Sequence, residues 1–141
     1  MKILYLSQLI PYPPDAGPKV RAYYALRYLA LRHEVTLLAF SRPDDRPEAV
    51  EHLKEFCDAV YTVPMRRSKL RDARSLITSL LGGRSFVIQR DTVPEMARKL
   101  DELLAEGDFD AVHADQLWMA QYALRVKQPQ FENPKTEYPG Y

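Results

Sequence analysis

A stiff loop with a single glycine precedes a helix-like segment near the start of the chain, and its residue types suit an anion site. The loop reads PYPPDAGPKVR, residues 11–21. Pro18 suits the first helical position, where no amide hydrogen is needed, and this places Gly17 at the N-cap. Because glycine has no Cβ, a bulky anion can approach the helix amides and the positive end of the helix dipole. The loop therefore predicts one wall of a phosphate or sugar site.

The loop matches neither common phosphate fingerprint. It is not G-x-G-x-x-G and not G-x-x-x-x-G-K-[ST], so the dinucleotide motif and the P-loop are excluded. The plainer alternative is a proline-braced connection that ends in a glycine cap.

A second group of polar residues follows the apolar run near residue 112, in the stretch HADQLWM, residues 113–119. His113 is either a site residue or a strand-end histidine bonded to the backbone. Asp115 is first of all a candidate N-cap for the helix that carries Trp118, with ligand binding as the second interpretation. Trp118, Met119 and Tyr122 recur at helical spacing, which favours a core role over a sugar-stacking platform.

Alternating apolar segments supply the elements that would position these residues. The runs 3–6 and 35–40 are typical of strands buried on both faces, and 58–65 and 110–114 predict a third and a fourth strand. Helices are expected between these strands. The apolar face of the first is formed by Val20, Tyr23, Tyr24, Leu26, Ala30 and Leu31. A second helix begins near Pro47, and a third runs from an N-cap at Asp91 or Thr92 to a C-cap at Gly107. A last helix is expected behind Asp115.

This alternation predicts an α/β fold, a Rossmann-like open parallel sheet with helices on both faces. Successive right-handed crossovers give a parallel sheet, and the common strand order is 3-2-1-4. Ligands of such sheets settle at the carboxyl ends of the strands, where the strand order reverses. The loop 7–21 and the segment 113–118 should therefore face each other across one crevice.

Composition limits the function classes. The chain has 141 residues, enough for one domain with a core, and its 20 Lys and Arg against 19 Asp and Glu give no general reason to expect a nucleic-acid partner. The single cysteine, Cys57, predicts a small buried side chain and no internal disulfide. His33 and His52 have no metal-ligand spacing and are expected to be solvated, so no metal site is predicted. The short apolar start argues against a signal peptide and leaves cytoplasmic residence as the default.

A basic segment follows the third strand. RRSKLRDARSLITSLLGG, residues 66–83, predicts an amphipathic helix ended by two glycines. Its basic residues are a solvated face or a contact with anionic lipid, which would make the protein peripheral to the inner face of a membrane. These residues are Arg66, Arg67, Lys69, Arg71 and Arg74.

Taken together, the segments MKILYLSQLIPYPPDAGPKVRAYYALRYLALRHEVTLLAF and FDAVHADQLWMAQYAL resemble the amino-terminal half of family 4 glycosyltransferases. The similarity covers about residues 1–125 and is greatest to the bacterial sugar transferases of exopolysaccharide systems. These enzymes have the GT-B architecture of two facing Rossmann-like domains. The amino-terminal domain binds mainly the acceptor and the second domain holds the nucleotide-sugar donor.

The resemblance implies roles for particular residues. Gly17 matches the glycine whose amide approaches the donor diphosphate, with Lys19 and Arg21 as the basic positions behind it. His113 matches a histidine near the transferred sugar and is the expected catalytic residue. The acceptor-side positions implied are Tyr12, Asp15, Asp115 and Gln116.

The resemblance also implies a retaining glycosyltransferase that needs no metal or other cofactor and acts on a glycan or lipid-linked acceptor. The family's glutamate-x7-glutamate motif is missing here, and residues 126–141, rich in proline, read as a linker or disordered tail. We therefore expect this chain to be inactive by itself. The alternatives are a non-catalytic membrane-surface or partner-binding α/β module and, less favoured, a flavodoxin-like nucleotide-binding regulator, whose acidic cluster at the strand ends is absent.

Overall fold

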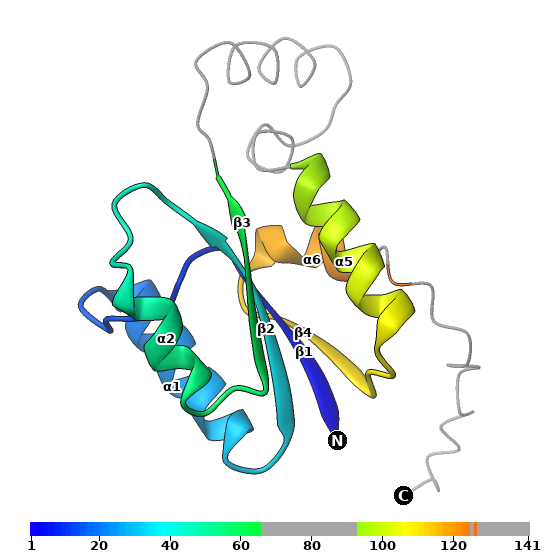
Figure 1. Cartoon of the computed structure of the whole chain (residues 1–141), viewed down its shortest axis with the longest axis horizontal. Helices are drawn as coiled ribbons and strands as arrows, with labels where there is room; N and C mark the ends of the chain where they lie inside the picture. Colours follow the sequence, from blue (N-terminus) through cyan, green and yellow to red (C-terminus); the bar gives the residue numbers. More distant parts are fainter. Residues whose placement is uncertain (66–92, 125, 127–141) are drawn as a thin grey trace, which may run out of the picture.

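Four parallel strands form one open sheet in the computed structural model, which describes residues 1–65, 93–124 and 126 (Figure 1). The strands are β1 (Lys2–Ser7), β2 (Glu34–Ser41), β3 (Ala59–Pro64) and β4 (Ala111–Ala114). Their order is β3-β2-β1-β4, as the sequence predicts. The register pairs Ile3 of β1 with Val35 on one side and with Ala111 on the other, which makes β1 the strand next to the reversal of order.

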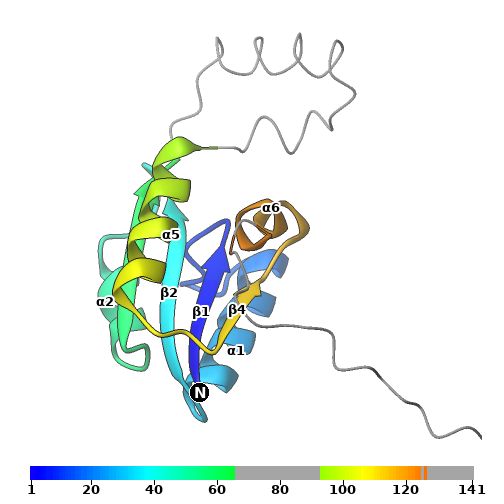
Figure 2. The same cartoon turned by 90° about the vertical axis from the view of Figure 1, so that its right-hand side faces the viewer.

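Helices cover both faces of the sheet, which confirms the α/β, Rossmann-like class. Helices α1 (Gly17–Ala30) and α2 (Glu48–Lys54) lie together on one face. Helix α5 (Pro94–Glu106) and the short α6 (Ala120–Ala123), with a 3-10 turn at Leu117–Met119 before it, lie on the other (Figures 1 and 2). No helix in the described ranges is long and apolar enough to span a bilayer.

Two hydrophobic cores follow from the alternation of side chains along each strand. Leu4 and Leu6 of β1 face the core built with α5 and α6, where Met96, Leu100 and Met119 are fully or almost fully buried. Ile3 and Tyr5 face the other core, whose helical residues include Tyr23, Leu26 and Leu53. Complete burial of one such side chain contributes about 1.5–3 kcal/mol. Cys57 lies in the second core with 6% of its surface exposed, as expected for a small buried side chain.

The helix starts differ from the sequence expectation. The N-cap of α1 is Ala16, not Gly17, so Gly17 is the first helical residue and Pro18 the second. The N-cap of α5 is Val93 instead of Asp91 or Thr92, while the C-cap at Gly107 is confirmed. Neither N-cap residue caps its helix with its own side chain, although the backbone N–H of Val93 donates to the Tyr122 hydroxyl at 2.8 Å. Residue type alone does not determine which residue is the cap, because a proline in the first turn fixes where each of these helices begins.

The predicted apolar face of α1 is also corrected. Its buried residues are Ala22, Tyr23 and Leu26, whereas Tyr24 and Leu31 are 57% and 74% exposed. Apolar residues occur almost all around this helix, so periodicity alone cannot tell which side meets the sheet.

Several sequence expectations lie outside the described residues. These are the basic helix at 66–81 with its five basic positions, the candidate caps Asp91 and Thr92, and nearly all of the predicted tail at 126–141.

Candidate functional site

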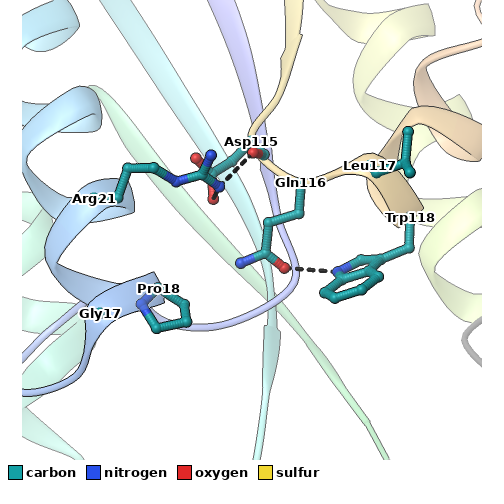
Figure 3. Close-up of a pocket in the computed structure, with 7 residues that line it drawn as sticks. All are labelled: Gly17, Pro18, Arg21, Asp115, Gln116, Leu117 and Trp118. Carbon is teal, nitrogen blue, oxygen red and sulfur yellow. Dashed lines mark hydrogen bonds and ion pairs between the residues drawn. The ribbon is translucent and has the colours of Figure 1, made fainter.

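A cavity of about 460 Å³ opens at the carboxyl ends of β1 and β4, where the strand order reverses. Figure 3 shows its two walls: the first turn of α1 on one side and the segment after β4 on the other. The lining residues are Gly17, Pro18, Arg21, Asp115, Gln116, Leu117 and Trp118. The sequence prediction that these two loops face each other is thus confirmed. This crevice is the usual ligand position of open parallel sheets.

The α1 wall presents a helix N-terminus that no side chain caps. The first four amides of a helix lack intrahelical partners, and they carry the positive end of the helix dipole. Pro18 has no amide hydrogen, so Gly17 and Lys19 supply the amides of this first turn. A Cβ built on Gly17 would meet no atom within 4 Å beyond its chain neighbours, so the space beside it is open. The first turn can therefore accept an anionic group.

Asp115 links the two walls. Its side chain is 4% exposed, and its Oδ1 accepts a hydrogen bond of 3.0 Å from the Tyr5 hydroxyl. Nη2 of Arg21 donates to the Asp115 backbone carbonyl at 2.8 Å and lies 3.4 Å from Oδ2 (Figure 3). A nearly buried carboxylate needs such partners, because an unpaired buried charge is costly.

The Tyr5 hydroxyl stays protonated in this arrangement. Burial raises the pKa of Tyr5 above its ordinary value, and the charge and hydrogen bond of Asp115 raise it further, while Arg21 acts in the opposite direction. Tyr5 is therefore the donor to Asp115. The expectation that Asp115 caps the following helix is wrong: Gln116 is the N-cap of the 3-10 turn, and the Asp115 carboxylate turns toward β1 and α1 instead.

Arg21 keeps donors for a ligand. Its side chain is 63% exposed, and both contacts to Asp115 use Nη2, which leaves the N–H groups of Nη1 and Nε. An anion at the first turn of α1 would meet this guanidinium, but the Asp115 carboxylate partly offsets its charge. The electrostatic potential that an anion meets in the pocket therefore depends on how far the positive charge of Arg21 compensates the negative charge of Asp115.

The opposite wall is polar and aromatic. The indole Nε1 of Trp118 donates to Oε1 of Gln116 at 2.6 Å (Figure 3). Trp118 is half-buried and packs against the α5 and α6 core, while Met119 and Tyr122 are each 1% exposed. The core role is thus confirmed for Met119 and Tyr122, and Trp118 both contacts the core and lines the cavity.

The remaining sequence candidates lie outside this lining. His113 is exposed on β4, and its ring stacks on Tyr5 with centroids 4.7 Å apart. Lys19 forms an ion pair with Asp15, Nζ to Oδ1, at 3.5 Å. Tyr12 packs against α2. The structure therefore brings Gly17, Arg21, Asp115 and Gln116 together in the pocket, whereas His113, Lys19, Asp15 and Tyr12 do not line it.

Sequence reasoning missed an aromatic clamp behind the opening loop, made of Tyr12, Tyr23, His52 and Phe56. His52 is not solvated, contrary to expectation: its side chain is 28% exposed, and its ring stacks on Tyr12 with centroids 3.9 Å apart. Nε2 of His52 lies 2.9 Å from the Tyr23 hydroxyl, and the Phe56 ring meets the imidazole edge-on. The sequence offers little to predict this contact, because only the presence of aromatic residues in the loop and in α1 indicates that their rings could stack.

Within the described ranges, no group of three or more His, Cys, Asp or Glu side chains is arranged so that it could hold a metal ion. Comparison of the chain with protein-family models, with curated proteins and with solved structures found no match. The site is an open crevice on a Rossmann-like sheet, lined by an uncapped helix start, an arginine and a tryptophan.

Proposed function

We propose that the chain is the acceptor-side, amino-terminal domain of a retaining glycosyltransferase of GT-B architecture. The observation that carries this proposal is the uncapped first turn of α1, which opens with Gly17 and Arg21 into the cavity at the β1/β4 switch point. Diphosphates of nucleotide sugars suit such a turn, since backbone amides and the helix dipole both favour negative charge. The resemblance of the loop PYPPDAGPKVR to family 4 enzymes adds the reaction class.

The pocket residues take distinct roles in this proposal. The amides of Gly17 and Lys19 and the free donors of Arg21 contact the donor diphosphate. Asp115 pairs with Nη2 of Arg21 and reduces the positive charge that meets the diphosphate. Gln116 offers its side-chain amide to a sugar hydroxyl. His113, exposed on β4, acts near the transferred sugar. A side chain that stabilises charge developing in the transition state raises the turnover rate more than the affinity for the donor.

A second domain supplies most donor contacts in enzymes of this architecture. The 141-residue chain by itself is therefore expected to bind diphosphate weakly and to turn over no nucleotide sugar. Transfer or hydrolysis of a nucleotide sugar by the purified chain would contradict this part of the proposal.

The site is tested by titrating the chain with inorganic pyrophosphate and with a nucleoside diphosphate. Trp118 is the single tryptophan of the chain and lines the cavity, so its fluorescence reports on occupancy. We expect a saturable change that weakens about tenfold to a hundredfold in Gly17→Val and in Arg21→Gln, since a hydrogen bond to a charged oxygen contributes about 1.5–3 kcal/mol. Added bulk at Gly17 enters open space, so the fold is retained.

Arg27→Gln is the matched control, because Arg27 lies on the same helix, is exposed, and does not line the cavity. Its affinity for pyrophosphate should equal that of the wild type. Wild-type affinity in a folded Gly17→Val protein would mean that the loop is only a braced connection.

A further inference from the structure

Helix α1 is apolar on the side that faces away from the sheet. Val20, Tyr24, Tyr28 and Leu31, here called the outer ridge, are 37%, 57%, 57% and 74% exposed. Their spacing of four, four and three residues places them on one helix face, opposite the buried side. Polar side chains normally occupy this position on a surface helix. Four apolar neighbours in a row are not scattered surface residues, and such a patch indicates an interaction surface.

The charge around the ridge is of one sign. Arg21, Arg27 and Arg32 are exposed beside it, and α1 contains no acidic residue. Arg32 lies over the Tyr28 ring, with its Cζ 4.0 Å from the centroid, so the ridge carries a cation on its aromatic surface. The ridge therefore suits a partner surface that carries acidic side chains.

The neighbouring helix α2 is of the opposite sign. Its exposed residues include Glu48, Glu51 and, just after its end, Glu55, against Lys54 and, just before its start, Arg46. Glu51 is paired with Lys54 at 2.8 Å, and Oε2 of Glu55 lies 3.5 Å from Nδ1 of His52, so the strip has a small net negative charge. Helices α1 and α2 lie side by side on the same face of the sheet (Figures 1 and 2), linked by the contact of Tyr23 with His52. One face of the molecule thus carries a basic, apolar strip next to an acidic strip.

We propose that a second copy of this chain covers the outer ridge, with α1 of each copy lying against α2 of the other. Both helices lead from the carboxyl end of one parallel strand to the amino end of the next, so they run in the same direction. A two-fold axis parallel to the helices then places each basic strip on the partner's acidic strip, twice, in a self-complementary interface. The net charge of +1 opposes such pairing very little.

An anionic lipid surface is a poorer occupant for the same ridge. The three carboxylates of α2 share the face with α1, and a negatively charged bilayer would repel them while attracting the arginines. A second copy satisfies both strips at once. This inference concerns the face covered by α1 and α2 and does not rest on the proposed function of the pocket.

Sedimentation of the full chain over a wide range of concentrations tests the proposal. We expect a reversible dimer whose dissociation constant rises with salt. Tyr28→Ser and Leu31→Ser should each weaken association roughly tenfold or more, as loss of a central apolar contact does at other interfaces. Leu124→Ser is the matched control, because Leu124 is 85% exposed but lies at the end of α6, on the opposite face. Circular dichroism checks that each variant is folded.

A pair of charge-reversed proteins makes the test specific for the α1–α2 pairing. One carries Arg27→Glu and Arg32→Glu, and the other carries Glu51→Lys and Glu55→Lys. Each alone places like charges against each other and should be monomeric, whereas their mixture restores both opposite-charge contacts and should form a heterodimer. Adding anionic vesicles to the wild-type chain completes the experiment.

Three results would overturn the proposal. The first is a monomer at every concentration, and the second is association that persists in Tyr28→Ser and Leu31→Ser or is lost in Leu124→Ser. The third is a mixture of the charge-reversed proteins that fails to pair. Vesicle binding by a monomeric chain that disappears in Tyr28→Ser would assign the ridge to lipid instead.

Discussion

Asp115 connects three parts of the molecule through one carboxylate. It reaches β1 through the Tyr5 hydroxyl and α1 through Arg21, and its backbone amide donates to the Leu6 carbonyl at 3.0 Å. The same side chain also brings a negative charge to a pocket that we assign to anions. Stability and ligand affinity are therefore expected to respond to this residue in opposite directions.

Asp115→Ala should lower the free energy of unfolding by about 1.5–3 kcal/mol, because Tyr5 and Arg21 lose a charged acceptor. Asp115→Asn keeps the shape and should cost less, while pyrophosphate affinity should rise in both variants because a repelling charge is removed. Chemical denaturation and the Trp118 fluorescence titration measure the two effects. Unchanged stability of Asp115→Ala would show that the Tyr5 and Arg21 contacts contribute nothing.

Cys57 links stability to alkaline pH. Burial raises the pKa of Cys57 to about 12, and the nearby Asp58 adds to the shift. An unfolded thiol ionises near pH 8.5, so between about pH 8.5 and 12 the unfolded state releases a proton that the folded state keeps. The stability from this group is complete below about pH 8.5 and is lost progressively above it, at up to about 1.4 kcal/mol per pH unit.

Urea denaturation of the wild type and of Cys57→Ala, measured from neutral pH to about pH 9.5, tests this linkage while most tyrosines are still protonated. The wild type should lose stability more steeply with pH than Cys57→Ala. Parallel curves for the two proteins would mean that the thiol ionises equally in both states.

At the scale of elements, the aromatic clamp attaches the opening loop to α2. Tyr12 stacks on His52, and His52 contacts the Tyr23 hydroxyl of α1. These contacts hold the loop that leads to Gly17 against α2. The position of the first turn of α1 in the cavity thus depends on a helix that does not line it.

His52→Ala should cost about 1–3 kcal/mol, the sum of one aromatic pair and one hydrogen bond. Amide hydrogen exchange should also accelerate in the loop 8–16, which loses its support. His33→Ala is the matched control, since within the described residues the His33 side chain makes no hydrogen bond, ion pair or ring contact. Equal exchange rates in the two variants would show that the clamp does not hold the loop.

Most elements were predictable because local apolar patterns determine them. Continuous apolar runs indicated β1 and β2, and periodicity with flanking proline and glycine indicated α5. The helix expected behind Asp115 is instead a 3-10 turn and a four-residue α6. Asp115 does not cap this helix, because its carboxylate accepts a hydrogen bond from the hydroxyl of Tyr5, a residue 110 positions away. Contacts over such distances in sequence leave no local pattern.

At the scale of the whole molecule, the sheet separates two hydrophobic cores. Leu53 of α2 and Leu100 of α5 are fully buried in different clusters on opposite faces. Leu53→Ala and Leu100→Ala should each cost about 2–5 kcal/mol. Because the sites share no partners, the double variant should lose the sum of the two values within about 0.5 kcal/mol.

Equilibrium denaturation of the three variants measures this additivity. A coupling larger than about 1 kcal/mol would mean that the sheet transmits strain between its faces.

The strand order and the position of the crevice were predictable from the sequence, since right-handed crossovers allow few arrangements of parallel strands. The residues inside the crevice were predicted only in part, because Tyr12, Lys19 and His113 come from the right segments but point elsewhere.

The central position of β1 also determines when the nascent chain is vulnerable during synthesis. β1 is synthesised before β4 and before the helices of one face. The backbone N–H of Lys2 donates to Oδ2 of Asp110, a partner 108 positions later. Ribosomes add roughly 5–20 residues per second, so several seconds pass before these segments emerge. Meanwhile Leu4, Leu6 and Leu38 lack their cover of α5 and α6. Because β4 is synthesised after the other three strands of this sheet, the apolar face that α5 and α6 cover stays exposed to solvent during that interval.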